Sequence, residues 1–317
     1  MNLRIGSRGS QLALWQANHI AGLLRSEGHT AEIEIIKTTG DRLQEVTFAQ
    51  VGSRGMFTKE IEEALAAGRV DLAVHSLKDL PTELPEPFAL AATPPRDDPR
   101  DALVSVRYGS LAALPQGARV GTSSQRRCAQ LKALRPDIEA QEFRGNVDTR
   151  LRKLAEGQVE AILLAAAGLD RLDKTEWVRE RLEPTDFCPA AGQGSLGIET
   201  RKDDAGTIAA VAFLDDAATR FAVTAERAAL AALGGGCQVP IGIHCRAGVK
   251  EAFGGGEGSW DEIFAMAAAP ETGSTVRIFH RAPRGDFDPV ALGWLAAQKL
   301  IEAGAGPLLE VSGGVSR

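Results

Sequence analysis

The stretch that decides the fold is Val70-Asp71-Leu72-Ala73-Val74-His75-Ser76-Leu77-Lys78-Asp79-Leu80-Pro81. Val70, Leu72 and Val74 alternate with polar or smaller neighbours, a period of two that is typical of a β-strand with one strongly buried face. The alternation ends at Ser76, and three prolines between positions 81 and 87 prevent the chain from continuing as a helix or a central strand. The sequence therefore predicts a strand followed at its carboxyl end by a polar turn.

The polar turn carries His75, Ser76, Lys78 and Asp79. In open α/β sheets, ligands bind at the edge formed by the carboxyl ends of the strands. A hydroxyl and an ammonium group can bind an anion there, while the carboxylate of Asp79 serves acid–base chemistry. A polar loop with a local Lys78–Asp79 ion pair is the alternative interpretation, because short motifs of this kind are common. His75 either orients its neighbours or is a buried histidine of the core.

The composition is that of an ordinary globular protein. The chain has 317 residues, enough for two or three domains, and is 44% hydrophobic and 25% charged. It has no apolar run of membrane-spanning length and no signal-peptide hydrophobic region, so we expect a cytoplasmic protein without a membrane partner. The net charge of −6 argues against a nucleic-acid partner. Four cysteines (Cys128, Cys188, Cys237 and Cys245) lack metal-site or redox spacing, so no metal is expected.

The first part of the chain alternates strands and helices. Residues 2–6 predict a strand, and Ser10 is a candidate N-cap of a helix that ends near Gly28. Arg8 and Ser10 therefore lie at a strand-to-helix turn, where unpaired N–H groups favour anions. The segment from Thr38 to Gly55 is predicted to be a long mobile loop of the kind that forms lids. Thr58 is predicted to cap the next helix.

A second α/β unit follows a proline-rich crossing at residues 94–101. Its predicted strands are 102–106, 118–121, 138–143 and 161–166. Arginine pairs stand beside the starts of its two predicted helices, again at strand-to-helix turns. The glycine-rich segment 188–199 indicates a return crossing. From about residue 217 the pattern predicts a small α+β unit, with a helix that ends in glycines before Cys237, strands at 239–246, 262–268 and 274–281, and a final helix.

Eight segments of the chain contain distinctive motifs, which occur in a fixed order: residues 4–17, 55–62, 75–81, 100–102, 121–127, 144–151, 190–197 and 235–240. Together they resemble the porphobilinogen deaminase (hydroxymethylbilane synthase) family. The resemblance implies two α/β domains arranged like type II periplasmic binding proteins around a cleft, and a small α+β carboxyl-terminal domain. The expected boundaries are 1–96 with 195–212, then 97–194, then 217–317.

The resemblance implies a transferase of tetrapyrrole and heme biosynthesis. Members of the family join four porphobilinogen molecules head to tail, lose ammonia each time and release hydroxymethylbilane by hydrolysis. Growth starts from a dipyrromethane cofactor, which the resemblance places on Cys237 through a thioether. The implied partners are porphobilinogen and the growing polypyrrole chain, and a monomer is expected.

The resemblance also assigns roles to individual residues. Asp79 is expected to be catalytic, since a carboxylate stabilises cationic pyrrole nitrogens and moves protons. Each pyrrole carries an acetate and a propionate, and the planar guanidinium group binds carboxylates through two hydrogen bonds. The residues expected to hold the cofactor are Cys237, Lys78, Ser10, Thr122, Ser123, Ser124, Arg126, Arg127 and Asn146. Those expected to hold the substrate are Arg8, Arg144, Arg150 and Ser76.

A rival function is a non-catalytic anion- or carboxylate-binding module of the periplasmic-binding-protein type. The first two units alone permit it, but a third unit with a cysteine loop has no purpose in such a binder. The lid loop departs from the family pattern, with Gly52-Ser53-Arg54-Gly55 where many members have Gly-Gly-Lys-Gly. Roles in that loop are therefore not assigned.

Overall fold

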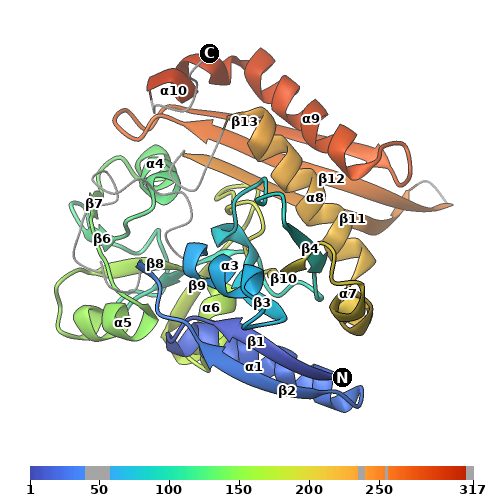
Figure 1. The fold of residues 1–317 in the computed structure, drawn as a ribbon. Helices are drawn as coiled ribbons and strands as arrows, with labels where there is room; N and C mark the ends of the chain where they lie inside the picture. Colours follow the sequence, from blue (N-terminus) through green and yellow to red (C-terminus); the bar gives the residue numbers. More distant parts are fainter. Residues whose placement is uncertain (40–57, 235–239, 254–255, 312–317) are drawn as a thin grey trace.

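The structure is a computed structural model that describes residues 1–39, 58–234, 240–253 and 256–311. Three sheets organise these residues, two of five strands and one of three (Figure 1). The predicted fold class, two α/β units followed by a small α+β unit, is confirmed. Two predictions fall largely outside the described residues: the lid loop and the cysteine loop with Cys237.

The first sheet has five strands in the order β2-β1-β3-β10-β4. Their bounds are β1 (Asn2–Ser7), β2 (Thr30–Ile35), β3 (Leu72–Ser76), β4 (Phe88–Ala92) and β10 (Leu196–Arg201). Helices α1 (Gln11–Ser26), α3 (Lys59–Ala66) and α7 (Ala205–Val211) pack around it. β1 runs parallel to β2 and β3, whereas β10 is antiparallel to both of its neighbours.

Strand β3 differs from the prediction of one strongly buried face. Leu72 and Val74 pack into the core with helix α1, and Ala73 packs with Ile61 and Leu65 of α3. Both faces are buried because β3 is a central strand covered by helices on each side, as strands of largely parallel sheets are.

The second sheet has the order β7-β6-β8-β5-β9. Its strands are β5 (Asp101–Val104), β6 (Arg119–Gly121), β7 (Glu139–Gln141), β8 (Ala161–Ala165) and β9 (Val178–Leu182). Its helices are α4 (Gln125–Leu134), α5 (Val147–Ala155) and α6 (Ala166–Arg171). The sequence pattern did not predict α6 or β9. β9 is an edge strand with charged residues at three of its five positions, so it lacks the apolar run of a central strand.

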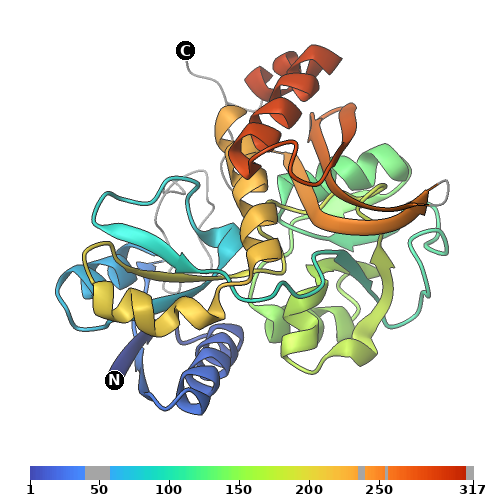
Figure 2. The ribbon, with the colours of Figure 1, turned by 90° about the vertical axis from the view of Figure 1, so that its right-hand side faces the viewer.

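The third sheet is formed by β11 (Ile241–Phe253), β12 (Gly256–Ala268) and β13 (Thr275–Pro283). Helices α8 (Ala217–Ala232) and α9 (Pro289–Leu300) pack against it, and α10 (Gly306–Val311) follows. Its strands extend beyond the predicted ones because the β11–β12 pairing continues to the end of the hairpin. Figure 2 shows α8 reaching from this sheet toward the other two units.

The chain crosses between the first two sheets twice. β4 belongs to the first sheet and β5 to the second, so residues 93–100 form the first crossing. The return crossing predicted from the glycine-rich segment is present, and it leads into β10, which lies between β3 and β4. The domain boundaries themselves stay a prediction.

The two predicted helix caps had different outcomes. Ser10 has extended backbone, and its Oγ accepts a hydrogen bond from the Ala13 N–H at 3.3 Å, so this N-cap is confirmed. The cap predicted at Thr58 is wrong, because its backbone is already helical and its side chain forms no capping bond. Among the described residues, no helix has the length and apolar character needed to cross a membrane.

Candidate functional site

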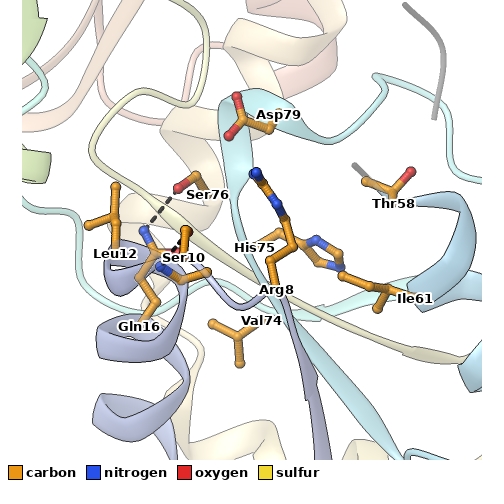
Figure 3. A pocket seen from close by; sticks show the side chains of 11 residues that line it. Arg8, Ser10, Leu12, Gln16, Thr58, Ile61, Val74, His75, Ser76 and Asp79 are labelled. Carbon is orange, nitrogen blue, oxygen red and sulfur yellow. Dashed lines mark hydrogen bonds between the residues drawn. The ribbon is translucent and has the colours of Figure 1, made fainter. Parts of the chain in front are cut away.

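A pocket opens at the carboxyl ends of β1 and β3, beside the first turns of α1 and α3 (Figure 3). Its cavity volume is about 70 Å³, which is room for several water molecules. The lining residues are Arg8, Ser10, Leu12, Ala13, Gln16, Thr58, Ile61, Val74, His75, Ser76 and Asp79. Four predicted site residues therefore share one pocket at the expected edge of the sheet: Arg8, Ser10, Ser76 and Asp79.

Asp79 ends the single 3₁₀ turn Leu77–Asp79 that follows β3. Leu77 and Leu80, on either side of its carboxylate, are buried against Val223 of helix α8. These two anchors fix the turn while the Asp79 side chain stays exposed at the rim of the pocket. Figure 3 shows Arg8 extending from the end of β1 toward the Asp79 carboxylate.

The pocket wall includes two buried polar contacts. The Gln16 Nε2 donates to Ser76 Oγ at 2.9 Å, and His75 Nε2 lies 2.9 Å from Glu199 Oε2 of β10. His75 lines the pocket and has a buried carboxylate partner, so it is a buried core histidine; a role in orienting its neighbours stays a prediction. The sequence analysis did not single out Gln16. Its place beside Ala17 and one turn before Ile20, on the buried face of an amphipathic helix, could have indicated a buried polar group.

A second cluster surrounds the Asp101 carboxylate at the start of β5. Arg126 Nη1 donates to Asp101 Oδ2 at 2.7 Å, and Arg127 Nη2 donates to Oδ1 at 2.7 Å. All three side chains are buried. Burial alone would raise the pKa of Asp101, but the two guanidinium groups hold it well below its usual range. The predicted arginine pair is thus preorganised by one shared carboxylate.

Lys78 interacts electrostatically with charged residues of both the pocket and the Asp101 cluster. Burial lowers its pKa to about 8, with Asp79 and Asp101 opposing the shift and the charges of Arg127 and Arg126 adding to it. Lys78 belongs to the first sheet's turn and the arginines to helix α4, so the structure brings the predicted cationic residues of both units together. An anion placed among them would favour the charged form of Lys78.

The predicted hydroxyl and amide ligands lie in the turns before α4 and α5. Ser124 and Asn146 are the N-caps of these helices and accept backbone N–H groups of Arg127 and Thr149. Ser123 Oγ bonds to the Phe143 backbone. Thr122 Oγ1 accepts the Ser124 N–H. Because Thr122 and Ser124 act there as acceptors, their own O–H groups remain suited to donate to an anion.

The two remaining predicted arginines differ in their surroundings. Arg144 is half-buried and its Nε donates to Glu142 at 2.6 Å. The Nε of Arg150 is buried and has no hydrogen-bond partner among the described residues. Burial lowers the pKa of Arg150 to about 10, and the neighbouring charges of Arg127 and Arg144 act in the same direction. Arg150 is therefore a cation whose surroundings favour an incoming anion.

Two buried polar residues near the crossings were missed at the sequence level. Arg171 donates to Asp97 and to the Gly194 carbonyl at 2.8 Å each, and Gln193 donates to Asp101 at 3.0 Å. No local pattern marks either residue, since their partners lie in distant segments. In the part of the chain that the structure describes, no group of His, Cys, Asp or Glu is arranged to hold a metal ion.

Comparisons with known proteins identify the family of this chain. The family described as "Porphobilinogen deaminase, dipyromethane cofactor binding domain" matches residues 3–209, and "Porphobilinogen deaminase, C-terminal domain" matches residues 220–252. A porphobilinogen deaminase of Roseiflexus sp. (strain RS-1) is 50% identical over 97% of this chain and 98% of that protein. Another from Trichlorobacter lovleyi is 49% identical over 97% of this chain and 96% of its own length.

Periplasmic binding proteins are among the solved structures that show a distant similarity to part of this chain. One from Desulfovibrio salexigens, a TRAP periplasmic solute binding protein, has a TM-score of 0.41 and 12% identity, covering 68% of this chain and 72% of that one. One from Salmonella typhimurium has a TM-score of 0.36 and 14% identity, with 69% and 93% covered. These distant structures do not identify the family, whereas the family models and the sequence relatives do. The chain belongs to the porphobilinogen deaminase family.

Proposed function

We propose that this chain is a hydroxymethylbilane synthase that joins four porphobilinogen molecules head to tail, with loss of ammonia, and releases hydroxymethylbilane by hydrolysis. Membership of the family supports this transferase function. The observation that carries the proposal is the position of Asp79 at the rim of the pocket, which Arg8 also lines. Lys78 and the arginine pair Arg126 and Arg127 lie close by.

The donor set fits a ligand that carries many carboxylates. The buried Nε of Arg150 has no partner among the described residues, and the pKa of Lys78 is lowered by burial to about 8. A carboxylate would satisfy the first group and favour the charged form of the second. We assign the cofactor carboxylates to Lys78, Ser10, Thr122, Ser123, Ser124, Arg126, Arg127 and Asn146. We assign the substrate carboxylates to Arg8, Arg144, Arg150 and Ser76.

The cofactor of this proposal is a dipyrromethane joined to Cys237 by a thioether. When bound, it supplies the terminal pyrrole carbon to which the first substrate is added. Cys237 lies outside the described residues, so its assignment rests on the sequence resemblance. The described residues contribute the carboxylate-binding groups on α4, α5 and the turn after β3.

Asp79 carries the chemistry in this proposal. As ammonia leaves the aminomethyl group of the substrate, positive charge develops on the pyrrole, and a fixed carboxylate nearby stabilises that charge. The α-carbon of the terminal pyrrole then forms a bond to the substrate methylene, and the same carboxylate accepts the proton that this attacking carbon must lose. Arg8 lines the same pocket and extends toward Asp79, so a substrate carboxylate bound to Arg8 would hold the reacting group close to the Asp79 carboxylate.

We also propose that the protein is a monomer and that it acts in the cytoplasm. The net charge of −6 supports the expectation of no nucleic-acid partner. Size-exclusion chromatography with light scattering measures the oligomeric state directly, and a stable dimer would contradict this part.

The mass of the purified chain tests the covalent cofactor. We expect an excess of two pyrrole units in the wild-type protein and none in Cys237→Ser, with a colour reaction to Ehrlich's reagent only in the wild type. A wild-type mass equal to that of the bare chain, or an adduct retained in Cys237→Ser, would overturn the assignment. Release of ammonia from added porphobilinogen separates this enzyme from a non-catalytic binder, which would bind without releasing any.

A further inference from the structure

The carboxylate of Glu226 on α8 is fully buried and joins four segments of the chain. Its oxygens accept hydrogen bonds from Arg96 Nη1 at 2.6 Å and from the backbone N–H groups of Gly192 at 2.6 Å and Cys245 at 2.8 Å. Arg96 belongs to the first crossing and Gly192 to the return crossing. One side chain of the third unit therefore fixes both connections between the other two.

The contacts continue from Glu226 to the arginine pair. Arg96 Nε donates to the Gln193 carbonyl at 2.9 Å. The Gln193 side chain then donates to the Pro99 carbonyl at 2.7 Å and to Asp101 Oδ1 at 3.0 Å. Asp101 in turn binds the guanidinium groups of both arginines of α4. Every side chain in this path is buried or nearly so, so each geometry constrains the next.

The network that leads from Glu226 to the arginine pair carries a net positive charge, which an anion can balance. Three guanidinium groups (Arg96, Arg126 and Arg127) face two carboxylates (Glu226 and Asp101). Burial lowers the pKa of the adjacent His244, which is therefore neutral at pH 7. One positive charge remains in excess, and it lies at the end where the arginine pair faces Lys78. A ligand carboxylate at that end balances it.

We propose that Glu226 is a positioning residue for the cofactor site: through Arg96 and Gln193 it fixes Asp101, and Asp101 fixes the guanidinium groups of Arg126 and Arg127. The inference rests on the proposed role of this arginine pair in holding cofactor carboxylates. It also gives the third unit a role in the binding site formed by the other two, in addition to supplying the segment that contains Cys237.

A matched control is available in the same unit. Glu262 on β12 is also buried, but it pairs with Arg246 and Arg281, which belong to the neighbouring strands of its own sheet. Glu262→Gln and Glu226→Gln each remove one buried carboxylate from the third unit, so both are expected to lower the melting temperature. Only Glu226→Gln breaks the path to the arginine pair.

The experiment compares full-length wild type, Glu226→Gln, Glu262→Gln, Gln193→Met and Arg127→Gln. Intact mass gives the fraction of chains that carry the adduct, steady-state kinetics give KM and kcat for porphobilinogen, and thermal unfolding gives the melting temperature. We expect Glu226→Gln and Gln193→Met to lose more than half of the adduct, or to raise KM at least fivefold when loaded. Glu262→Gln should load fully and keep its KM.

The outcomes separate the inference from the proposed function. If Arg127→Gln is impaired while Glu226→Gln and Glu262→Gln load and turn over equally well, the positioning role is wrong and the proposed function stands. If Arg127→Gln itself loads and turns over like wild type, the assigned role of the arginine pair fails. Gln193→Met keeps every charge, so it tests the positioning role even if Glu226→Gln does not fold. Full loading of Gln193→Met with an unchanged KM would overturn the inference.

Discussion

Asp79 shows how one residue is exposed and fixed at the same time. Its carboxylate reaches the pocket, while Leu77 and Leu80 beside it are buried against α8. Packing of the neighbours therefore restricts the backbone without using the functional atoms. Such an arrangement suits a charge that has to be in place before the reaction begins.

Replacing Asp79 by Asn should remove the charge with little effect on the fold, since the two side chains are nearly isosteric. We expect single-turnover product formation to fall by about 10²–10³-fold or more, the range for loss of a preorganised electrostatic group. Asp79→Glu keeps the charge but displaces it by about one methylene, so it should retain partial activity. Circular dichroism controls for folding. A folded Asp79→Asn enzyme within about tenfold of wild type would place the catalytic carboxylate elsewhere.

At the scale of elements, the return crossing holds the site together because it contains glycines that allow close approach. Gly194 has a φ of +88°, and a Cβ there would lie 2.6 Å from the Asp97 carbonyl oxygen of the other crossing. Gly192 has a φ of +73° and packs against the turn that carries Lys78. The two crossings and the turn Leu77–Asp79 can touch only because these side chains are absent.

Gly194→Ala tests this requirement. Gly157 offers a matched control, because its φ of +77° is similar but a Cβ there would meet no other atom within 4 Å. Both variants incur the conformational cost of a left-handed residue, roughly 1 kcal/mol. Gly194→Ala also clashes with the Asp97 carbonyl, so we expect it to unfold at lower urea and to lose kcat/KM. Equal urea midpoints and unchanged activity in the two variants would show that the crossings are loosely packed.

For the whole molecule, the buried carboxylates Asp101 and Glu226 make stability depend on pH, and Glu226 also links the three units. Burial would raise the pKa of Glu226, but Arg96 and His244 hold it at about 2, and the pKa of Asp101 is likewise lowered by its two arginines. Both groups have lower pKa values in the folded chain than in the unfolded chain. The stability they contribute is therefore present above their unfolded pKa values and is lost as the pH falls through the folded values.

We expect the free energy of unfolding to decrease as the pH falls from about 5 to about 3, because the unfolded chain then binds more protons than the folded one. Urea unfolding at a series of pH values measures this slope. Glu226→Gln should be less stable at neutral pH and should have a shallower slope in the acidic range. A variant curve parallel to that of wild type would mean that Glu226 does not contribute to the acid sensitivity.

The sequence by itself determined the local features of the protein. The alternation before Ser76 placed the strand β3, the prolines placed its end, and Asp79 was selected as a site residue from that pattern. Ser10 was identified as the cap of the helix that the structure shows at Gln11–Ser26. These features depend on residues a few positions apart, so one short stretch of sequence contains all the information that they need.

Only the tertiary structure decided which distant groups became partners. The sequence marked Arg126 and Arg127 as anion ligands but could not show that Asp101, about 25 positions away, already joins them. It likewise could not pair His75 with Glu199, 124 positions along the chain, or connect Glu226 to the crossings. A buried polar group must find a partner wherever packing brings one near, and that neighbour is set by how the sheets and helices assemble rather than by sequence spacing.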